Sequence, residues 1–282
     1  MTDFYAVIGN PIHQSKSPLI HGMFAQATGQ DMHYSAIEGP LDGFAGAVDA
    51  FRAAGGLGLN ITTPFKLDAF AYATECSERA QLAGAANAMK FDGDRVLAEN
   101  FDGIGLVRDV VHNLNCPLKA RRVLLLGAGG ASAGVLGPLI EAGPAEVVVA
   151  NRSADKAEVL VQRHAAYARD HGVRLSARTL QDPGVGYDVF VNGTAASLSG
   201  SGVPVGPQVL RRGALALDMM YGPAAQAFLD WARQHGAVPR DGLGMLVEQA
   251  AESFFVWRGV RPDTRPVLCE LRAMVDAPTP SA

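Results

Sequence analysis

The sequence predicts an α/β protein of two domains. Short apolar strands alternate with helices along the chain, which is the pattern of a mainly parallel sheet. The composition turns polar near residues 115–121 and a second series of strands follows, so a second domain is expected to begin there. With 282 residues, 48% of them hydrophobic and 18% charged, the chain is long enough for two domains.

Composition and charge narrow the class of protein. The net charge of −4 gives no basic field for nucleic acid. The N-terminus has no signal pattern and no apolar run reaches the roughly 18 residues of a membrane span, so a cytoplasmic protein without a membrane partner is expected. The three cysteines fit a reducing compartment. Neither they nor the seven histidines show the spacing of a metal site.

The first part of the chain predicts strands and helices in alternation. We expect strands over 4–8 and 34–37, a helix from Ser17 to about Thr28, and a helix over 41–54. Ser17 precedes a proline, which is typical of a helix N-cap. Because the carboxyl ends of parallel strands share one edge of a sheet, polar residues that follow these strands are the candidates for function.

The segment Asn60-Ile61-Thr62-Thr63-Pro64-Phe65-Lys66 is the most informative of these strand ends. A short apolar strand over 57–59 precedes it. Thr63 followed by Pro64 predicts an N-cap and a first-turn proline, which places Lys66 in the first turn of a helix. The partial positive charge of a helix N-terminus disfavours the charged ammonium, so Lys66 is suited to proton exchange. A solvated lysine is the alternative.

Three hydroxyl side chains are expected at the same edge. Ser15 and Ser17 stand one residue apart, and Thr62 lies in the segment just described. The two serines could bind a polyol or a carboxylate. A solvated Ser15 and an N-cap role for Ser17 are the structural alternatives.

Two further polar residues precede predicted elements. Asn87 leads into a hairpin over 88–98, where it could be a turn residue or a ligand contact. Asp102 precedes a helix over 104–113, which it could cap. Its functional alternative is a carboxylate that holds and tunes Lys66.

A glycine-rich loop opens the second domain. The apolar strand expected over 123–126 is followed by Gly127-Ala128-Gly129-Gly130-Ala131 and by a helix to about Glu141. The first glycine permits a tight turn, and the second lets the backbone approach a pyrophosphate at the helix N-terminus. Ser132 stands at the third fingerprint position and is small enough for close packing. This order of strand, loop and helix predicts a Rossmann-type dinucleotide-binding domain.

The next strand end indicates which dinucleotide binds. The strand over 146–150 ends at Asn151-Arg152-Ser153, with Lys156 close behind. No acidic residue stands there for a ribose 2′-hydroxyl. Arg152 and Lys156 instead suit a 2′-phosphate, which predicts NADP(H); a solvated basic turn is the alternative.

The remaining chain continues the alternation. We expect three helices and two strands, over 155–170, 224–235, 245–258, 187–191 and 215–219. Thr194 follows the first of these strands and could touch the nucleotide. Gln249 lies beside the apolar stripe of the last helix, where it is either a satisfied core amide or a ligand contact.

Together these segments resemble the shikimate dehydrogenase family over nearly the whole chain. Ser15-Lys16-Ser17 is similar to the family's SxS motif, and residues 60–66 are similar to its NVTxPxK motif. The other similar segments are SERA at 77–80, GAANAM at 84–89, NFDG at 100–103, GAGGA at 127–131, NRS at 151–153, MMYGP at 219–223 and MLVEQAAESF at 245–254.

The resemblance implies a cleft between a discontinuous substrate domain over 1–103 and 242–282 and a Rossmann-type NADP-binding domain over 104–241. It implies reversible reduction of 3-dehydroshikimate to shikimate by NADPH in aromatic amino-acid biosynthesis, with Lys66 and Asp102 as the catalytic pair. The implied substrate residues are Ser15, Ser17, Thr62, Lys66, Asn87, Asp102, Tyr221 and Gln249. The implied cofactor residues are Glu78, Gly127, Ala128, Gly129, Gly130, Ala131, Asn151, Arg152, Ser153, Lys156, Thr194, Met219 and Gly242.

The sequence departs from the family's pattern at three places. His13-Gln14 replace the usual Gly-His before the serines, Ala88 replaces a threonine after Asn87, and Phe101 replaces a threonine before Asp102. The last two remove hydroxyls near the substrate. Two alternatives stay open: a quinate/shikimate dehydrogenase relative that uses NAD or another cyclic hydroxy acid, and a non-catalytic NADP-binding sensor. A homodimer is compatible with the sequence, which does not determine the oligomeric state.

Overall fold

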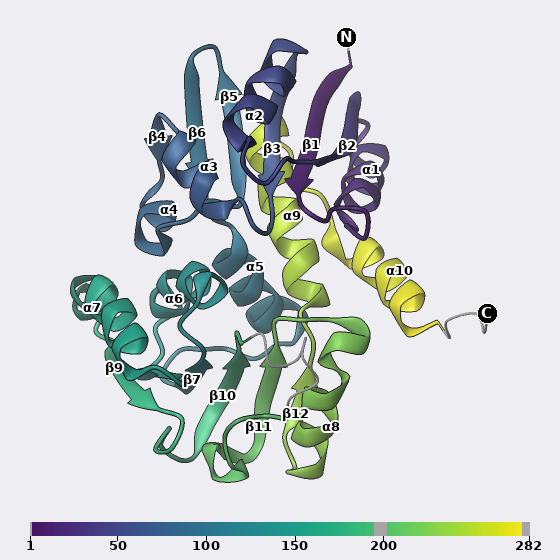
Figure 1. Cartoon of the computed structure of the whole chain (residues 1–282). Coiled ribbons are helices and arrows are strands. Elements are labelled where there is room, and N and C mark those ends of the chain that lie inside the picture. The colour runs from purple at the N-terminus through teal and green to yellow at the C-terminus, as the bar shows by residue number, and fades with distance from the viewer. Residues whose placement is uncertain (1, 195–201, 278–282) are drawn as a thin grey trace. The chain divides into compact units, whose positions relative to one another are not determined.

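The computed structural model describes residues 2–194 and 202–277, which divide into two compact units (Figure 1). Unit 1 runs to Gly105 and includes Val247–Val267, and unit 2 comprises Leu106–Leu246 and the chain from Leu268 onward. The sequence instead assigns all of 242–282 to the first domain. The two divisions differ because the second half of the C-terminal helix makes its contacts within unit 2.

Unit 1 is built on a six-stranded sheet with the strand order β2-β1-β3-β5-β6-β4. Its strands are β1 (Asp3–Gly9), β2 (Met32–Glu38), β3 (Gly56–Ile61), β4 (Glu75–Cys76), β5 (Ala88–Asp92) and β6 (Arg95–Glu99). The first three are parallel, whereas β5 and β6 form an antiparallel hairpin beside β3. The expected mainly parallel sheet and the hairpin are both confirmed.

Short helices follow the strands of unit 1. They are α1 (Ser17–Thr28), α2 (Phe44–Ala53), α3 (Lys66–Tyr72) and α4 (Glu78–Ala83), and the domain limits fall within α5 (Asp102–Arg108), α9 (Leu243–Arg258) and α10 (Thr264–Asp276). Gly29 ends α1 in the left-handed conformation, as the sequence predicts. The sequence does not predict α4, which is too short to show a clear helical period. Its Ser77 side chain caps it by accepting from the Ala80 amide.

Both faces of the unit 1 sheet are covered. Ala6 and Ile8 of β1 belong to a hydrophobic cluster with Phe65 and Met89, on the side of α2 and α3. Tyr5 and Val7 belong to a second cluster, in which Tyr5 stacks on Trp257 of α9. This alternation explains why residues 4–8 form a continuous apolar run rather than an alternating one.

Unit 2 contains a second six-stranded sheet with the order β12-β11-β10-β7-β8-β9. Its strands are β7 (Arg122–Leu126), β8 (Glu146–Asn151), β9 (Arg174–Thr179), β10 (Tyr187–Asn192), β11 (Leu210–Asp218) and β12 (Val238–Arg240), and every pair is parallel. This is the doubly wound arrangement expected of the second domain. The sequence does not predict the edge strands β9, which contains few apolar residues, and β12, which has three residues; both strands are half-exposed.

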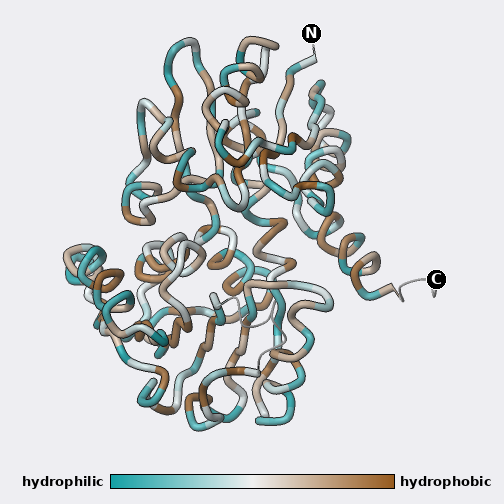
Figure 2. Tube along the Cα trace, in the orientation of Figure 1, coloured by the Kyte–Doolittle hydropathy of each residue, from teal (hydrophilic) through white to brown (hydrophobic). Residues whose placement is uncertain are grey.

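Helices join these strands. They are η1 (Asp109–Asn113), α6 (Gly130–Glu141), α7 (Ala154–Asp170), η3 (Pro207–Val209), η4 (Gly222–Ala225) and α8 (Gln226–Gln234). Along α7 hydrophilic and hydrophobic residues alternate (Figure 2), and Ala157, Leu160, His164 and Ala168 form its buried face. The expected helix over 104–113 is present as α5 followed directly by η1, whose five residues have the wider turn of a π-helix.

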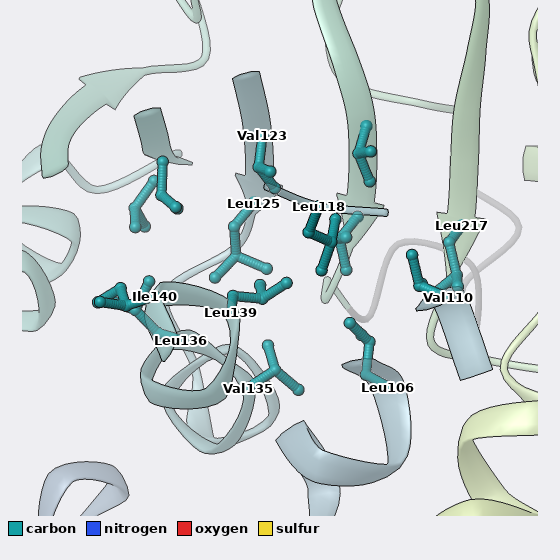
Figure 3. Packing of buried hydrophobic residues seen from close by; sticks show 14 of the residues in the cluster. Leu106, Val110, Leu118, Val123, Leu125, Val135, Leu136, Leu139, Ile140 and Leu217 are labelled. Carbon is teal, nitrogen blue, oxygen red and sulfur yellow. The ribbon is translucent and has the colours of Figure 1, made fainter. Parts of the chain in front are cut away.

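The core of unit 2 explains the apolar sequence of β7. Val123 and Leu125 pack with Leu136, Leu139 and Ile140 of α6 (Figure 3). Leu124 and Leu126 point to the opposite face, into a cluster with Phe190 and Phe228. A strand buried on both faces ends where it leaves this core, which places the glycine loop directly at the carboxyl edge of the sheet.

Among the described residues, none of the helices combines the length and the apolar character that crossing a bilayer requires.

Candidate active site

Lys66 is placed by a tight turn after β3. The Thr62 amide donates to the Ile8 carbonyl of β1 (3.0 Å), and the Phe65 amide donates back to the Thr62 carbonyl (3.0 Å). The helix α3 then begins at Lys66, so the prediction that Lys66 lies in the first turn is confirmed. The prediction that Thr63 is the N-cap is wrong: Phe65 occupies that position, because the cis Thr63–Pro64 peptide belongs to the turn and not to the helix.

The amine of Lys66 is held by a buried carboxylate. Its Nζ donates to Oδ2 of Asp102 at 2.6 Å, with the lysine side chain 27% exposed and the aspartate 5% exposed. Asp102 is the first residue of α5. In the described part of the chain its carboxylate accepts from Lys66 and Asn87 and not from an amide of α5, whereas the Asn100 side chain accepts from the Asp102 amide (3.2 Å). Of the two roles that the sequence left open, the contact with Lys66 is therefore the one observed.

Asn87 connects this pair to the last helix of unit 1. Its Oδ1 accepts from the Phe101 amide (2.8 Å), which fixes the orientation of the side-chain amide. Its Nδ2 then donates to Asp102 Oδ1 and to Gln249 Oε1, both at 2.8 Å. Four residues from β3–α3, the β5 end, α5 and α9 thus form one hydrogen-bonded set, and all four were named from the sequence.

Gln249 enters the set through its carbonyl oxygen alone. Within residues 2–194 and 202–277, its Nε2 makes no hydrogen bond to a protein group. That amide is therefore available to an oxygen of a ligand, which a satisfied core glutamine would not be.

The two serines lie at the start of α1. The Ser17 amide donates to Ser15 Oγ (3.3 Å), and α1 begins at Ser17 with Lys16 as its N-cap. The prediction that Ser17 caps this helix is wrong, because no side-chain capping bond forms there. The Ser17 hydroxyl instead forms a hydrogen bond with the Tyr34 hydroxyl. Ser17 is thus tied to the sheet and not to its own helix.

A buried network that the sequence did not reveal joins the serines to Asn87. The Tyr34 hydroxyl donates to Asn60 Oδ1 (2.7 Å), and Asn60 Nδ2 donates to Ser253 Oγ (2.7 Å) and to the Asn87 carbonyl (3.4 Å). Burial raises the pKa of Tyr34 well above its usual value, against the opposing effect of its bond to Ser17. The tyrosine is a neutral hydrogen-bonding group.

His21 completes that network. Its ring stacks on Tyr34 with centroids 4.1 Å apart, and Nε2 donates to Asn60 Oδ1 (3.1 Å). Complete burial lowers the pKa of His21 to about 3, although the bond to Asn60 acts to raise it. A neutral histidine explains why its Nδ1 is buried without a partner among the described residues. The only sequence signal for this network was the polar Asn60 inside an apolar strand.

Close packing also places Thr62. A Cβ built on Gly9 would lie 2.4 Å from Thr62 Cγ2, so only glycine lets the β1 end approach that threonine. The sequence suggested that the residues at positions 88 and 101 would face the substrate, where the family's pattern has hydroxyls. The structure instead buries both side chains. Ala88 and Phe101 are 2% and 1% exposed and belong to the core.

The glycine loop of unit 2 matches the shape that a diphosphate requires. Gly127 has φ +104°, and a Cβ there would lie 3.1 Å from both Gly193 and the buried Ser132 Oγ. A Cβ on Gly129 or Gly130 would instead meet nothing within 4 Å, which leaves open space beside this backbone. Among residues 2–194 and 202–277, no side chain caps the twelve-residue helix α6, which leaves its first amides available to an anion.

The cations expected to select the 2′-phosphate lie at the adjacent strand end. Arg152 and Lys156 are exposed, and neither has a carboxylate within 4 Å in the part of the chain that the structure describes. The Asn151 side chain donates to the Ser153 carbonyl (3.0 Å) and shapes the turn before α7, which no side chain caps. Two unneutralised cations beside two open helix ends fit a phosphorylated dinucleotide.

Three backbone hydrogen bonds align the loops of this edge. The Gly127 amide donates to Ala150 (2.8 Å), the Gly193 amide donates to Leu126 (2.8 Å), and the Met219 amide donates to Asn192 (3.0 Å). Thr194 follows, with its hydroxyl donating to Asn192 Oδ1 (2.8 Å). The predicted cofactor residues Gly127–Ala131, Asn151–Ser153, Lys156, Thr194 and Met219 therefore share one edge of the sheet.

Met219, Tyr221 and Gly242 form a further group in unit 2. The Gly242 amide donates to the Met220 carbonyl (2.9 Å), and a Cβ on Gly242 would lie 2.2 Å from Met219 O. Burial raises the pKa of Tyr221, and the charge of the neighbouring Asp241 raises it further. Tyr221 is thus the one predicted substrate residue in unit 2, and the exposed Glu78 at the start of α4 is the one predicted cofactor residue in unit 1.

Three family models match the chain in sequence. The substrate-binding domain of shikimate dehydrogenase matches residues 7–89, shikimate/quinate 5-dehydrogenase matches 109–197, and the C-terminal domain of shikimate 5′-dehydrogenase matches 242–270.

Curated proteins and solved structures agree with these models. A shikimate dehydrogenase (NADP(+)) of Acidovorax sp. is 58% identical over 275 residues, which cover 98% of each chain. An Ael1 enzyme of Pseudomonas putida is 52% identical with a TM-score of 0.89, covering 98% of this chain and 99% of that one. Shikimate 5-dehydrogenase of Thermus thermophilus, solved with NADP(H) and shikimate, is 30% identical with a TM-score of 0.84 and coverage of 96% and 99%. The chain therefore belongs to the shikimate dehydrogenase family.

Proposed function

We propose that this protein catalyses the reversible NADPH-dependent reduction of 3-dehydroshikimate to shikimate, a step of aromatic amino-acid biosynthesis. The observation that carries the proposal is the 2.6 Å contact between Lys66 and the buried Asp102, within a set that includes Asn87 and Gln249. The names of the relatives and the shikimate and NADP(H) bound to the Thermus enzyme support the substrate and the cofactor.

Lys66 is the proton donor of the reduction. When bound, NADPH would supply a hydride to the C3 carbonyl carbon. The Lys66 ammonium gives a proton to the carbonyl oxygen, so that C=O becomes CH–OH. In the reverse direction the neutral amine takes the hydroxyl proton. Asp102 holds the amine in place through Oδ2, while Asn87 holds the other carboxylate oxygen. Because both carboxylate oxygens are fixed, the carboxylate holds the amine in one orientation before the reaction begins.

The remaining polar groups of unit 1 suit the other substituents of the substrate. Ser15 and Ser17 would bind the carboxylate at C1. Thr62, Asn87, Asp102 and the free amide of Gln249 would bind ring hydroxyls. Tyr221 is proposed as a further substrate contact from unit 2.

The nucleotide is proposed to bind along the carboxyl edge of the unit 2 sheet. Its diphosphate would lie against Gly127–Ala131, where two glycines leave open space and α6 has free amides. The 2′-phosphate would pair with Arg152 and Lys156, beside Asn151 and Ser153. Thr194, Met219 and Gly242 would complete the cofactor contacts, with Glu78 as a contact from unit 1.

The substitutions at Ala88 and Phe101 favour testing a second substrate. The family model that matches residues 109–197 covers both shikimate and quinate dehydrogenases, and the family's pattern has a hydroxyl at each of these two positions, next in sequence to Asn87 and Asp102. Since both side chains are buried in the core, they leave the Lys66–Asp102 set intact. We therefore propose shikimate as the substrate, with quinate as the alternative.

Initial rates with shikimate and quinate, each with NADP⁺ and with NAD⁺, test the proposal. We expect shikimate with NADP⁺ to give the highest kcat/KM. A higher kcat/KM with quinate or with NAD⁺ would transfer the assignment to the alternative dehydrogenase. NADP⁺ binding without turnover of either acid would identify a non-catalytic sensor.

The three cysteines Cys76, Cys116 and Cys269 are free thiols, which supports the proposal of a reducing, cytoplasmic location. A homodimer is proposed as the assembly to test, and sedimentation equilibrium of the full chain would measure it.

A further inference from the structure

An ion pair with a buried carboxylate lies in unit 2, outside all the predicted site residues. Arg272 of α10 donates through Nη1 to Oδ2 of Asp241 at 2.8 Å and through Nη2 to Oδ1 at 2.5 Å. The Asp241 side chain is 3% exposed and that of Arg272 is 40% exposed. This two-point geometry fixes both the distance and the orientation of the carboxylate.

The same carboxylate also accepts two backbone amides from opposite sides. The Leu243 amide at the start of α9 donates to Oδ1 (3.3 Å), and the Gly222 amide donates to Oδ2 (3.4 Å). Burial acts to raise the pKa of Asp241, but Arg272 and the two amides lower it below its usual value. Asp241 is therefore an anion that ties the turn after β11 to the first residue of α9.

The turn held in this way carries two of the proposed ligand contacts, Met219 and Tyr221, and a third, Gly242, lies against it. It runs from Met219 through Tyr221 to Gly222, and Gly242 packs against it so closely that a Cβ would lie 2.2 Å from Met219 O. Asp218 fixes the other end, since its Oδ1 accepts from the Met220 amide (2.9 Å). At the Gly222 end, the Asp241 carboxylate accepts the Gly222 amide just where the helix η4 begins.

The helix α10 supports the turn from behind. Gly222 has φ +64°, and a Cβ there would lie 3.3 Å from Val275, one helical turn beyond Arg272. Arg272 and Val275 thus present one face of α10 to the turn. This contact also accounts for the assignment of the end of α10 to unit 2.

We infer that Asp241 and Arg272 are positioning residues, which hold the Met219–Gly222 turn and Gly242 in the conformation that binds cofactor and substrate. The inference rests on the proposed contacts of Met219, Tyr221 and Gly242. Neither residue touches the reacting atoms. Their loss therefore weakens ligand binding and leaves the Lys66–Asp102 pair of unit 1 unaltered.

The chain offers a matched control pair. Arg261 binds Glu252 in unit 1 through the same two-point geometry, at 2.8 and 2.9 Å, with the arginine 36% and the glutamate 9% exposed. The substitutions Arg272→Met and Arg261→Met each leave a buried carboxylate without its arginine. Both are expected to lower the melting temperature by a similar amount.

The two variants should differ in ligand binding. For Arg272→Met we expect the Kd for NADP⁺, measured by fluorescence titration without turnover, to rise about tenfold or more. The KM for shikimate should rise as well, with an unchanged pH profile of kcat. For Arg261→Met both constants should stay within about twofold of the wild type. Arg272→Lys keeps the positive charge but cannot form two parallel hydrogen bonds to the carboxylate, so it should recover part of the affinity.

Equal Kd and KM values for Arg272→Met and Arg261→Met, at similar losses of melting temperature, would show that the Asp241–Arg272 pair is structural only. If Arg272→Met does not fold, the same comparison is made between Arg272→Lys and Arg261→Lys. Failure of the proposed function is separable, because it would appear as absent shikimate turnover in the wild type. The NADP⁺ titration would still decide the role of the pair.

Discussion

The two units hold their functional groups by different means. In unit 1 the groups are side chains, and each orients the next: Asn87 fixes Asp102, and Asp102 fixes Lys66. In unit 2 the proposed phosphate site is mainly backbone, shaped by Gly127, Gly129 and the uncapped start of α6. Changes in unit 1 should therefore propagate from one residue to the next, whereas changes along the unit 2 edge should act locally.

The largest expected effect is the loss of the proton donor. Lys66→Ala should lower kcat by roughly 10²–10⁴-fold with little change in KM, because the amine acts in the transition state. Steady-state kinetics with shikimate and NADP⁺ measure both constants. Lys90→Ala is the control, since Lys90 is an exposed lysine of the same unit whose amine donates to the Val256 carbonyl. A Lys66→Ala variant with near-wild-type kcat would remove the lysine from the mechanism.

The next effect tests the backbone site of unit 2. Gly129→Val should raise the KM for NADPH about a hundredfold, since its side chain would fill the open space proposed for the diphosphate and cost about two charge-assisted hydrogen bonds. Thermal unfolding should be nearly unchanged, because a Cβ at Gly129 meets no atom within 4 Å. Gly46→Val, also open but in unit 1, should leave the KM unchanged. Equal KM values in both variants would place the diphosphate elsewhere.

Gly127→Ala should have the opposite effect to Gly129→Val, because it should change stability rather than leave it unchanged. With φ +104° and Gly193 at 3.1 Å, an alanine there should lower the free energy of unfolding by about 1–3 kcal/mol. Urea denaturation measures the loss. A wild-type midpoint would show that the loop relaxes without strain.

The cofactor preference should respond to Arg152. Arg152→Ala should raise the KM for NADPH by about 10–100-fold, as expected for the loss of a hydrogen bond between charged groups, and should change the KM for NADH far less. Kinetics with both cofactors measure the ratio. Arg169→Ala serves as the control, because Arg169 lies in the last turn of α7, at the opposite end of that helix from Arg152. Equal effects on the two cofactors would refute the phosphate contact.

The effect that is smallest near neutral pH concerns the buried network of unit 1. His21 has a folded-state pKa of about 3 against 6.5 when exposed. The unfolded chain therefore binds a proton that the folded chain does not between these values, and stability that is complete above pH 6.5 is lost as the pH falls towards 3. The slope should be up to about 1.4 kcal/mol per pH unit. His21→Gln should remove it, whereas His13→Gln, at an exposed site, should retain it. Identical slopes in urea titrations would contradict the burial of a neutral His21.

The sequence predicted most of the fold because its strands are apolar runs bounded by glycine and proline. The prediction failed where a short sequence pattern suggested one local structure but contacts with the rest of the fold determined another. Thr63-Pro64 has the composition of a helix start, yet the structure uses the proline in a cis turn and starts α3 at Lys66. The edge strand β9 alternates Leu175 and Ala177 with polar residues but contains only these two apolar side chains, and β12 has only three residues.

The site was predictable to the extent that its motifs are contiguous. The glycine loop could be interpreted from its own residues. For Asp102, 36 positions from Lys66, the residues left two roles open, a helix cap or a partner of Lys66, and the family resemblance favoured the second. Tyr34 and His21 were missed because aromatic residues in a strand and a helix usually indicate core. Their polar role depends on Asn60 lying opposite both, which only the folded chain shows.

The most direct test of the central claim is a double-mutant cycle on Lys66 and Asp102, measured as kcat for shikimate oxidation by NADP⁺. If the two residues act as one proton-transfer unit, Lys66→Ala with Asp102→Asn should be no slower than Lys66→Ala alone, so that the effects are strongly non-additive. Effects that multiply would contradict the account, because they would mean that the 2.6 Å contact has no part in catalysis.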